Sequence, residues 1–363
     1  MNIAAVAKST NGWSSEETIS IEVTTHCNSN CPHCFARAGM PGYSSLSPGL
    51  VKEIIAEGHA AGFRHLHITG GEPLLWEGLF DALDYTFGIG YKSVFINTNG
   101  TLLTADVAQK IAAYKGCSIS VSLDGDEALH NRLRGEGSYR KTVSGIETAL
   151  DAGMELVVFT IARKSLMASL PYFADGLYGQ FPDITCLILI QLFSLTDDAF
   201  TLSGEFLEPH DFLKMVQTVS LLNLYGRPII IKNNPLTNVV SKLIEMPWIP
   251  QTPPLYRSGN LFIMANRNIS ISHSCRNSLG KYKPGTIRQV LSSKAYQAAV
   301  TPDEKTCPTC PYENVCRQNG MLRPSEYYRD ENPDAPYCQR VLKSVEPRAV
   351  IKEHASTGAM LNL

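Results

Sequence analysis

The stretch CNSNCPHC, residues 27–34, places three thiols within eight residues, on Cys27, Cys31 and Cys34. The preceding segment, ISIEV over residues 19–23, alternates apolar and polar side chains and contains β-branched residues, which predicts a strand. The three cysteines are therefore expected on the loop that leaves a strand. Soft thiolates that share one short loop can bind a common metal centre.

Two kinds of metal centre suit such a loop. A structural zinc site takes four protein ligands, so His26, His33 or a residue elsewhere would have to complete it. A cubane iron–sulfur cluster also needs four ligands, one for each iron. Three cysteines would then leave one iron open to another molecule.

The composition is that of a globular chain. Its 363 residues are 44% hydrophobic and 18% charged, which suits one large domain and a smaller one. The net charge of -2, without a long run of one sign, predicts no nucleic-acid or membrane-surface binding. Residues 1–13 are too short and polar for a signal peptide, and the most apolar run, 187–193, is too short to span a bilayer. We therefore expect a soluble, cytoplasmic protein.

From residue 19 to about residue 193 the chain repeats one unit of apolar strand, loop and amphipathic helix. Alternation of this kind predicts parallel strands joined by crossover helices, in an open sheet or a barrel. In both architectures the active site lies at the carboxyl ends of the strands, where the cysteine loop is expected. Strands are predicted over residues 19–24, 65–69, 93–98, 118–123, 156–161 and 186–193, and helices over 48–61, 79–87, 105–114, 140–152 and 166–178.

The remaining chain is less regular. Proline-rich turns lie between residues 247 and 254, and residues 341–363 form an unassigned tail. The other predicted elements are a helix over 209–224, a strand over 228–231, a hairpin of 261–264 with 269–272, and a helix over 286–299.

The second predicted strand is followed by Gly70, Gly71, Glu72 and Pro73. Two glycines let a backbone approach a ligand closely, and a glutamate can accept a hydrogen bond from a cation. The same letters also make an ordinary turn.

The cysteine loop after the first strand, together with this GGEP motif after the second, resembles the radical S-adenosylmethionine (SAM) enzymes. The resemblance implies an α/β fold, a partial (β/α)6 TIM-like barrel, over residues 15–195. It implies that the three cysteines hold a [4Fe-4S] cluster whose open iron is chelated by SAM. The GGEP residues 70–73 would receive the amino group of SAM.

The same resemblance assigns further cofactor contacts on the loops after the third and fourth strands. Asn99, Ser122 and Asp124 would make polar contacts to SAM, and the planar fork of Arg134 would bind its carboxylate, with Arg132 as the competitor. His33 would lie near the adenine. Asn-Gly and Asp-Gly are also common in turns, and a surface arginine is usually solvated.

The resemblance implies a reaction as well. A reductant such as flavodoxin or ferredoxin would reduce the cluster, and SAM would be cleaved to methionine and a 5′-deoxyadenosyl radical. That radical would abstract a hydrogen atom from the substrate. The sequence offers no catalytic acid or base with a recognisable motif.

Four further thiols, on Cys307, Cys310, Cys316 and Cys338, form a full ligand set for a second cubane cluster or for zinc. Clustered cysteines in a reducing cytoplasm are more often metal ligands than disulfides. Behind a radical SAM core they resemble the SPASM/twitch extension, which implies a small α+β domain over residues 261–340 with one auxiliary [4Fe-4S] cluster. Val290 and Gly320 stand where the full pattern has cysteines, and Cys275 lies outside the set.

The substrate is predicted from the group of enzymes that the chain resembles. We expect cross-linking or oxidation of a ribosomally made peptide, with residues 196–260 contacting the substrate. Because the core begins almost at the first residue, a peptide substrate would require direct recognition or a separate leader-peptide-binding protein. The alternatives are an oxidoreductase of modified-haem or sugar/aminocyclitol biosynthesis acting on a small molecule, a methyltransferase that uses SAM differently, and a zinc-stabilised, non-catalytic barrel.

Overall fold

The fold is taken from a computed structural model. It describes residues 17–34, 36–39, 41–192, 202, 204–232, 234–246, 248–250, 259–272, 278–300, 311–312, 315–316 and 337–345.

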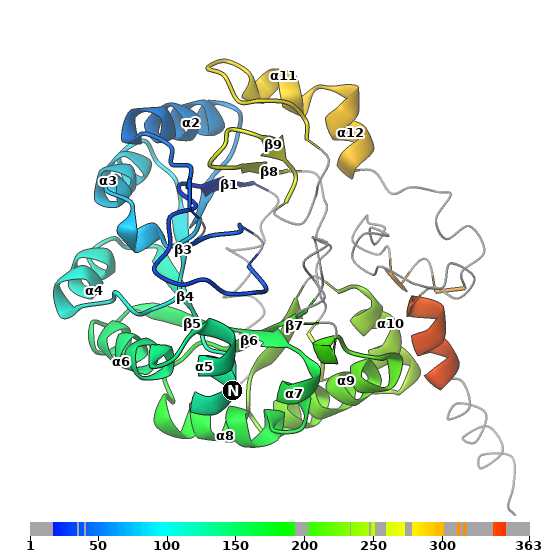
Figure 1. The fold of residues 1–363 in the computed structure, drawn as a ribbon. Coiled ribbons are helices and arrows are strands. Elements are labelled where there is room, and N and C mark those ends of the chain that lie inside the picture. The colour runs from blue at the N-terminus through cyan, green and yellow to red at the C-terminus, as the bar shows by residue number, and fades with distance from the viewer. Residues whose placement is uncertain are drawn as a thin grey trace, which may run out of the picture.

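The described part of the chain is built on one open nine-stranded sheet, with the order β7-β6-β5-β4-β3-β2-β1-β8-β9. Neighbouring strands from β7 to β8 are parallel, and only β9 is antiparallel to its neighbour. The sheet curves into a partial barrel with helices around its outer side (Figure 1). Its strands are β1 (Thr18–Glu22), β2 (His65–Thr69), β3 (Ser93–Thr98), β4 (Cys117–Ser122), β5 (Glu155–Ala162), β6 (Leu187–Gln191), β7 (Ile229–Lys232), β8 (Asn260–Ile263) and β9 (Ile269–Ser270).

The helices follow the strands as expected of crossover connections. They are α2 (Pro48–Ala60), the 3-10 helix η2 (Pro73–Leu75), α3 (Leu79–Gly88), α4 (Ala105–Ala112), α5 (Glu127–Arg134), α6 (Ser138–Asp151), α7 (Lys164–Met167), α8 (Leu170–Gln180), α9 (Pro209–Leu224), α10 (Leu236–Leu243), α11 (Ile287–Leu291) and α12 (Lys294–Val300). Residues 337–345 form a further helix, drawn in red in Figure 1, whose Tyr337 ring contacts Phe212 of α9. No helix in the described ranges is long and apolar enough to cross a membrane.

The structure confirms the predicted alternation and corrects several of the predicted helices. The helix expected over 166–178 is broken into α7 and α8, because Pro171 stands in the first turn of α8 and fits a helix start rather than its interior. The helix expected over 286–299 divides into α11 and α12, where the Ser293 hydroxyl accepts a hydrogen bond from the Tyr296 N–H. Helices α5 and α10 were not predicted.

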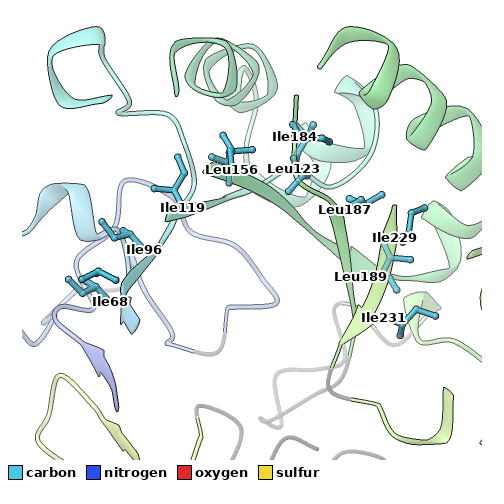
Figure 2. Packing of buried hydrophobic residues seen from close by; sticks show 14 of the residues in the cluster. Ile68, Ile96, Ile119, Leu123, Leu156, Ile184, Leu187, Leu189, Ile229 and Ile231 are labelled. Carbon is cyan, nitrogen blue, oxygen red and sulfur yellow. The ribbon is translucent and has the colours of Figure 1, made fainter. Parts of the chain in front are cut away.

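Strand alternation divides the side chains of the sheet between two environments. One set, which includes Ile68, Ile96, Ile119 and Leu156, is buried between the strands and the outer helices (Figure 2). The opposite set points to the inner side of the barrel. On β5 to β7 this inner set is largely apolar. On β1 to β4 it is mostly polar apart from Phe95, with hydrogen bonds between Ser20 and His67 and from Ser120 to Asn97.

Strands outside the expected barrel core extend the same sheet. The strand expected within the connecting region is β7, paired with β6, and the first strand of the expected hairpin is β8, paired in parallel with β1. The boundaries 15–195, 196–260 and 261–340 therefore do not coincide with breaks in the sheet. They remain predictions of domain organisation.

One carboxylate on α2 fastens the segment before α11 to the barrel. The Glu57 side chain accepts hydrogen bonds from the Tyr282 hydroxyl (2.9 Å), the Gly285 N–H (3.1 Å) and the Ile287 N–H. Two of these donors are backbone groups at the start of α11, which otherwise lack an intrahelical acceptor.

We predict that Glu57→Ala lowers the free energy of unfolding by about 1–3 kcal/mol, because it leaves two backbone donors unpaired. Hydrogen exchange should accelerate over residues 282–291 first. The matched control is Glu53→Ala, four residues earlier on the exposed face of the same helix, which should change little. Equal effects of the two variants on exchange and denaturation would contradict the assignment.

Candidate functional site

The cysteine loop lies at the carboxyl end of β1, and Cys27, Cys31 and Cys34 are all half-buried free thiols. Backbone N–H groups point at two of the sulfurs, from Ser29 to Cys27 (3.4 Å) and from Ala38 to Cys34 (3.4 Å). Such donors favour a thiolate, although burial raises the pKa of the Cys31 thiol to about 11 in the absence of a bound cation. A coordinating metal deprotonates its thiol ligands.

The three cysteines are candidate ligands of one metal centre. Within the described ranges, no three His, Cys, Asp or Glu side chains lie together as they would around a single ion. In a cubane cluster each thiolate binds a different iron, so the sulfurs need not converge on one point.

The glycine pair holds the cysteine loop in place. The Gly71 N–H donates to the Thr24 carbonyl (2.6 Å), and the Glu72 N–H donates to the His26 carbonyl (2.9 Å). A Cβ atom on Gly71 would lie 2.2 Å from the His26 oxygen, and one on Gly70 would lie 2.5 Å from the Thr24 oxygen. The two glycines therefore let the GGEP loop approach the backbone of the cysteine loop closely, and their approach to a ligand stays a prediction.

Glu72 is fully buried and joins the second and third strand ends. Its carboxylate accepts hydrogen bonds from the Leu74 N–H (3.1 Å), the Thr98 hydroxyl (2.7 Å) and the Asn99 N–H (2.8 Å). Burial raises the pKa of this carboxyl, against the effect of these donors. Pro73 opens the short helix η2 directly behind it.

Asn99 connects the third loop to the cysteine loop. Its side-chain nitrogen donates to the Asn28 oxygen (2.8 Å) and lies 3.9 Å from the Cys27 sulfur. Its side-chain oxygen accepts from the Thr101 N–H (2.9 Å). The predicted site residues after β1, β2 and β3 thus form one hydrogen-bonded group.

The loop after β4 supplies a buried ion pair. The Asp124 carboxylate has no exposed surface and accepts hydrogen bonds from the Arg134 Nε and from the Ile161 N–H (2.7 Å). Burial alone would raise the pKa of Asp124, but Arg134 and these donors hold it well below its usual range. Both oxygens of Asp124 are thus engaged by the chain itself.

Arg134 is the arginine that faces the cysteine loop. Its Nη1 lies 4.0 Å from the Cys31 sulfur, and its Nη2 lies 3.4 Å from the His33 Nε2. Arg132 instead pairs with Glu205 and is largely exposed. Ser122 ends β4 half-buried, on the same side of the strand as Ser120.

His33 is held as a neutral ring. Burial and the charge of Arg134 lower the pKa of His33 to about 3. Its Nδ1 is buried and has no hydrogen-bond partner in the described part of the chain. The ring is therefore available to a polar group of a bound molecule.

Three residues of this region have no motif that reveals them in the sequence. Arg163 follows β5, has 1% of its surface exposed, and donates to the Asp124 and Leu129 carbonyls (both 3.1 Å). The His130 Nδ1 accepts from the Asp124 N–H (3.1 Å). Glu22 ends β1 and accepts from the Ala265 N–H (3.0 Å).

The carboxy-terminal cysteines are described only in part. Cys316 and Cys338 are half-buried, whereas Cys307, Cys310 and Cys275 lie outside the described residues. The auxiliary ligand set therefore remains a prediction.

Comparison with known families identifies the part of the chain that carries this site. The model of the Radical SAM superfamily matches residues 21–163, a range that contains the cysteine loop, the GGEP motif and Arg134. These residues are a radical SAM domain, as the sequence predicted. Enzymes with this domain use a [4Fe-4S] cluster and SAM.

Curated relatives share this part of the chain. An AdoMet-dependent heme synthase of Oleidesulfovibrio alaskensis is 36% identical over 162 residues, which cover 43% of this chain and 40% of the relative. The mycofactocin maturase MftC of Mycolicibacterium smegmatis is 32% identical over 149 residues, 41% of this chain and 36% of the relative. The chain thus matches less than half the length of these relatives.

Solved structures share the fold. The anSMEcpe structure with bound AdoMet superimposes with a TM-score of 0.69 at 14% identity, covering 94% of this chain and 96% of that protein. Streptococcus suis SuiB bound to the precursor peptide SuiA gives a TM-score of 0.61 at 14% identity, covering 93% and 73%. The predicted partial barrel is therefore confirmed.

We predict that Gly71→Ala abolishes cluster binding, because the new methyl group would push the His26 carbonyl and the cysteine loop away from the GGEP loop. Iron and sulfide per chain, measured after purification without oxygen, should fall to the level of a variant in which Cys27, Cys31 and Cys34 are replaced by alanine. Gly49→Ala on α2, where nothing lies within 4 Å of the added atom, should keep the iron of the unsubstituted protein.

The raised pKa of Glu22 predicts how the free energy of unfolding depends on pH. Burial raises the pKa of Glu22 to about 7, so the native state keeps this proton to higher pH than the unfolded chain does. The contribution of Glu22 to stability should therefore fall as the pH rises from about 5 to about 7.

Glu22→Gln removes this ionisation and keeps an acceptor for the Ala265 N–H. Relative to the unsubstituted protein, its free energy of unfolding should rise by about 2–3 kcal/mol between about pH 5 and about pH 8. Urea denaturation at the two pH values measures this difference. A difference between the two proteins that is independent of pH would show that Glu22 ionises normally.

Proposed function

We propose that this chain is a radical SAM enzyme that removes a hydrogen atom from its substrate, and that the substrate is a ribosomally made peptide. The observation that carries the enzyme assignment is the group formed by the three-cysteine loop and the GGEP loop inside a radical SAM domain. When bound, a [4Fe-4S] cluster with SAM supplies one-electron chemistry that starts hydrogen abstraction.

The residues present fit these cofactors. Cys27, Cys31 and Cys34 would each hold one iron and leave the fourth iron for SAM. The Glu72 carboxylate accepts three hydrogen bonds from the chain and keeps capacity for a fourth, which would come from the amino group of SAM. Arg134 directs two nitrogens towards the cysteine loop and would bind the carboxylate of SAM.

The other predicted contacts acquire more specific roles in this proposal. Asn99 orients the cysteine loop through Asn28, and Ser122 offers a hydroxyl group at the end of β4. Asp124 acts through Arg134, because both of its oxygens are engaged by the chain. His33 offers a neutral ring nitrogen to the adenosyl part of the cofactor.

A peptide substrate is supported by two kinds of relative. MftC is named as a mycofactocin maturase, and SuiB was solved with its precursor peptide. The four cysteines at positions 307, 310, 316 and 338 would hold one auxiliary cluster. That cluster would accept the electron that a substrate radical loses when it is oxidised. A flavodoxin or ferredoxin would serve as reductant, and a separate leader-binding protein would deliver the peptide.

A haem precursor is the second candidate substrate, because the 36% identical relative is named as a heme synthase. The two candidates differ in a measurable product. With SAM and reductant, a peptide substrate would change mass in a defined fragment of the peptide, whereas a haem-type substrate would change its visible absorption spectrum and its mass.

We predict that protein purified without oxygen holds about eight irons and that a variant with Cys27, Cys31 and Cys34 replaced by alanine holds about four. With dithionite, only the unsubstituted protein should convert SAM to 5′-deoxyadenosine. Its three cysteines supply every protein ligand of the SAM-binding cluster, so no residual cleavage is expected.

Two results would change the proposal. Stoichiometric zinc without iron would overturn the radical mechanism in favour of a zinc-stabilised barrel. About four irons, lost entirely in the variant, would remove the auxiliary cluster and leave SAM cleavage in place.

A further inference from the structure

Arg134, Arg163 and Asp124 form a buried charged group at the carboxyl ends of β4 and β5. The side chain of Arg134 is 12% exposed, Arg163 is 1% exposed and Asp124 is fully buried. Among these three residues, two positive charges and one negative charge leave one positive charge in excess, before the Cys31 sulfur 4.0 Å from Arg134 is counted. The neighbouring His33 and His130 can only add to this excess, because a histidine is either neutral or positive.

The nearest other ion pair does not change this balance. Arg132 pairs with Glu205, whose second oxygen accepts a hydrogen bond from the Ser165 N–H (2.9 Å). This pair lies at the rim, since the Arg132 side chain is 64% exposed. Glu72, at the end of β2, accepts hydrogen bonds from the Thr98 hydroxyl and the Asn99 N–H. The positive charge in excess therefore belongs to the group of Asp124, Arg134 and Arg163.

Arg163 has a donor that the protein does not use. Its Nη2 donates to the carbonyls of Asp124 and Leu129, whereas its Nη1 is buried without a hydrogen-bond partner among the described residues. A buried charge in excess, with an unfilled donor, is unfavourable unless an anion or a polar group enters the site.

The same arginine fixes the geometry of the ion pair. By bonding to Asp124 and to Leu129 on α5, it ties the end of β4 and helix α5 to the end of β5. Arg134 is the last residue of α5. Displacing α5 would therefore turn the fork of Arg134 away from the cysteine loop.

We propose that Arg163 is a positioning residue for the carboxylate of SAM, acting through Asp124 and Arg134. It supplies the positive charge that Asp124 would otherwise cancel, and it holds Arg134 towards the cysteine loop. This inference rests on the proposed function, because it requires SAM at the cluster. The complementary group is Glu72, which faces the amino end of the same ligand.

The test compares two ligands that differ by one group. Dissociation constants for SAM and for decarboxylated SAM are measured by calorimetric titration of the cluster-loaded protein, without reductant and without turnover. In Arg163→Met the affinity for SAM should fall about tenfold, the loss expected for one partly screened charge, whereas the affinity for decarboxylated SAM should stay constant. Arg163→Lys should recover most of the preference for the carboxylate.

Arg132→Met is the matched control, since it removes an arginine from the exposed rim of the same loops, and it should leave both affinities unchanged. If Arg163→Met fails to retain the iron of the unsubstituted protein, Arg163→Gln replaces it, because glutamine is neutral and can still donate to a carbonyl.

The outcomes separate this inference from the proposed function. If the unsubstituted protein binds no SAM, the proposed function fails. If that protein binds SAM and the neutral variants weaken both ligands equally, Arg163 has only a structural role and the inference is overturned. A loss confined to SAM supports it.

Discussion

The site depends on two backbone hydrogen bonds, from Gly71 to Thr24 and from Glu72 to His26. They join the loop after β2 to the segment that leads from β1 into the three cysteines. Because the donors and acceptors belong to the main chain, the only requirement on side chains is that positions 70 and 71 have none. The GGEP motif therefore supports the cysteine loop structurally, and it is also a candidate contact for SAM.

A second constraint is electrostatic. The loops after β4 and β5 bury Asp124, Arg134 and Arg163 together, at a cost that only their mutual hydrogen bonds and a suitable ligand can offset. Glu72, at the end of β2, is a second buried carboxyl group of the site. In the proposed function, Glu72 would bind the ammonium group of SAM and Arg134 would bind its carboxylate.

The sequence predicted the structure well where it contains a periodic apolar pattern or a motif with fixed spacing. Apolar alternation placed β2 and β3 correctly, and cysteine spacing with GGEP identified the domain. Helix α5 was missed because its residues are mostly polar, so it shows no apolar stripe. Glu22 and Arg163 were missed because a single charged residue at a strand end has no spacing signal. Their burial is decided by segments far away in the chain, such as Ala265 for Glu22.

The pairing of β1 with β8 has a consequence for biosynthesis. Residues 18–21 at the start of the domain take their second neighbour from residues 260–263. During synthesis the strands from β1 to β7 can assemble in order, but β1 remains an open edge until β8 has left the ribosome. The cysteine loop follows β1, so the strand that precedes this loop gains its second neighbour only after residues 260–263 have been synthesised. Nascent or shortened chains that end before residue 260 would expose an edge that can pair with other chains.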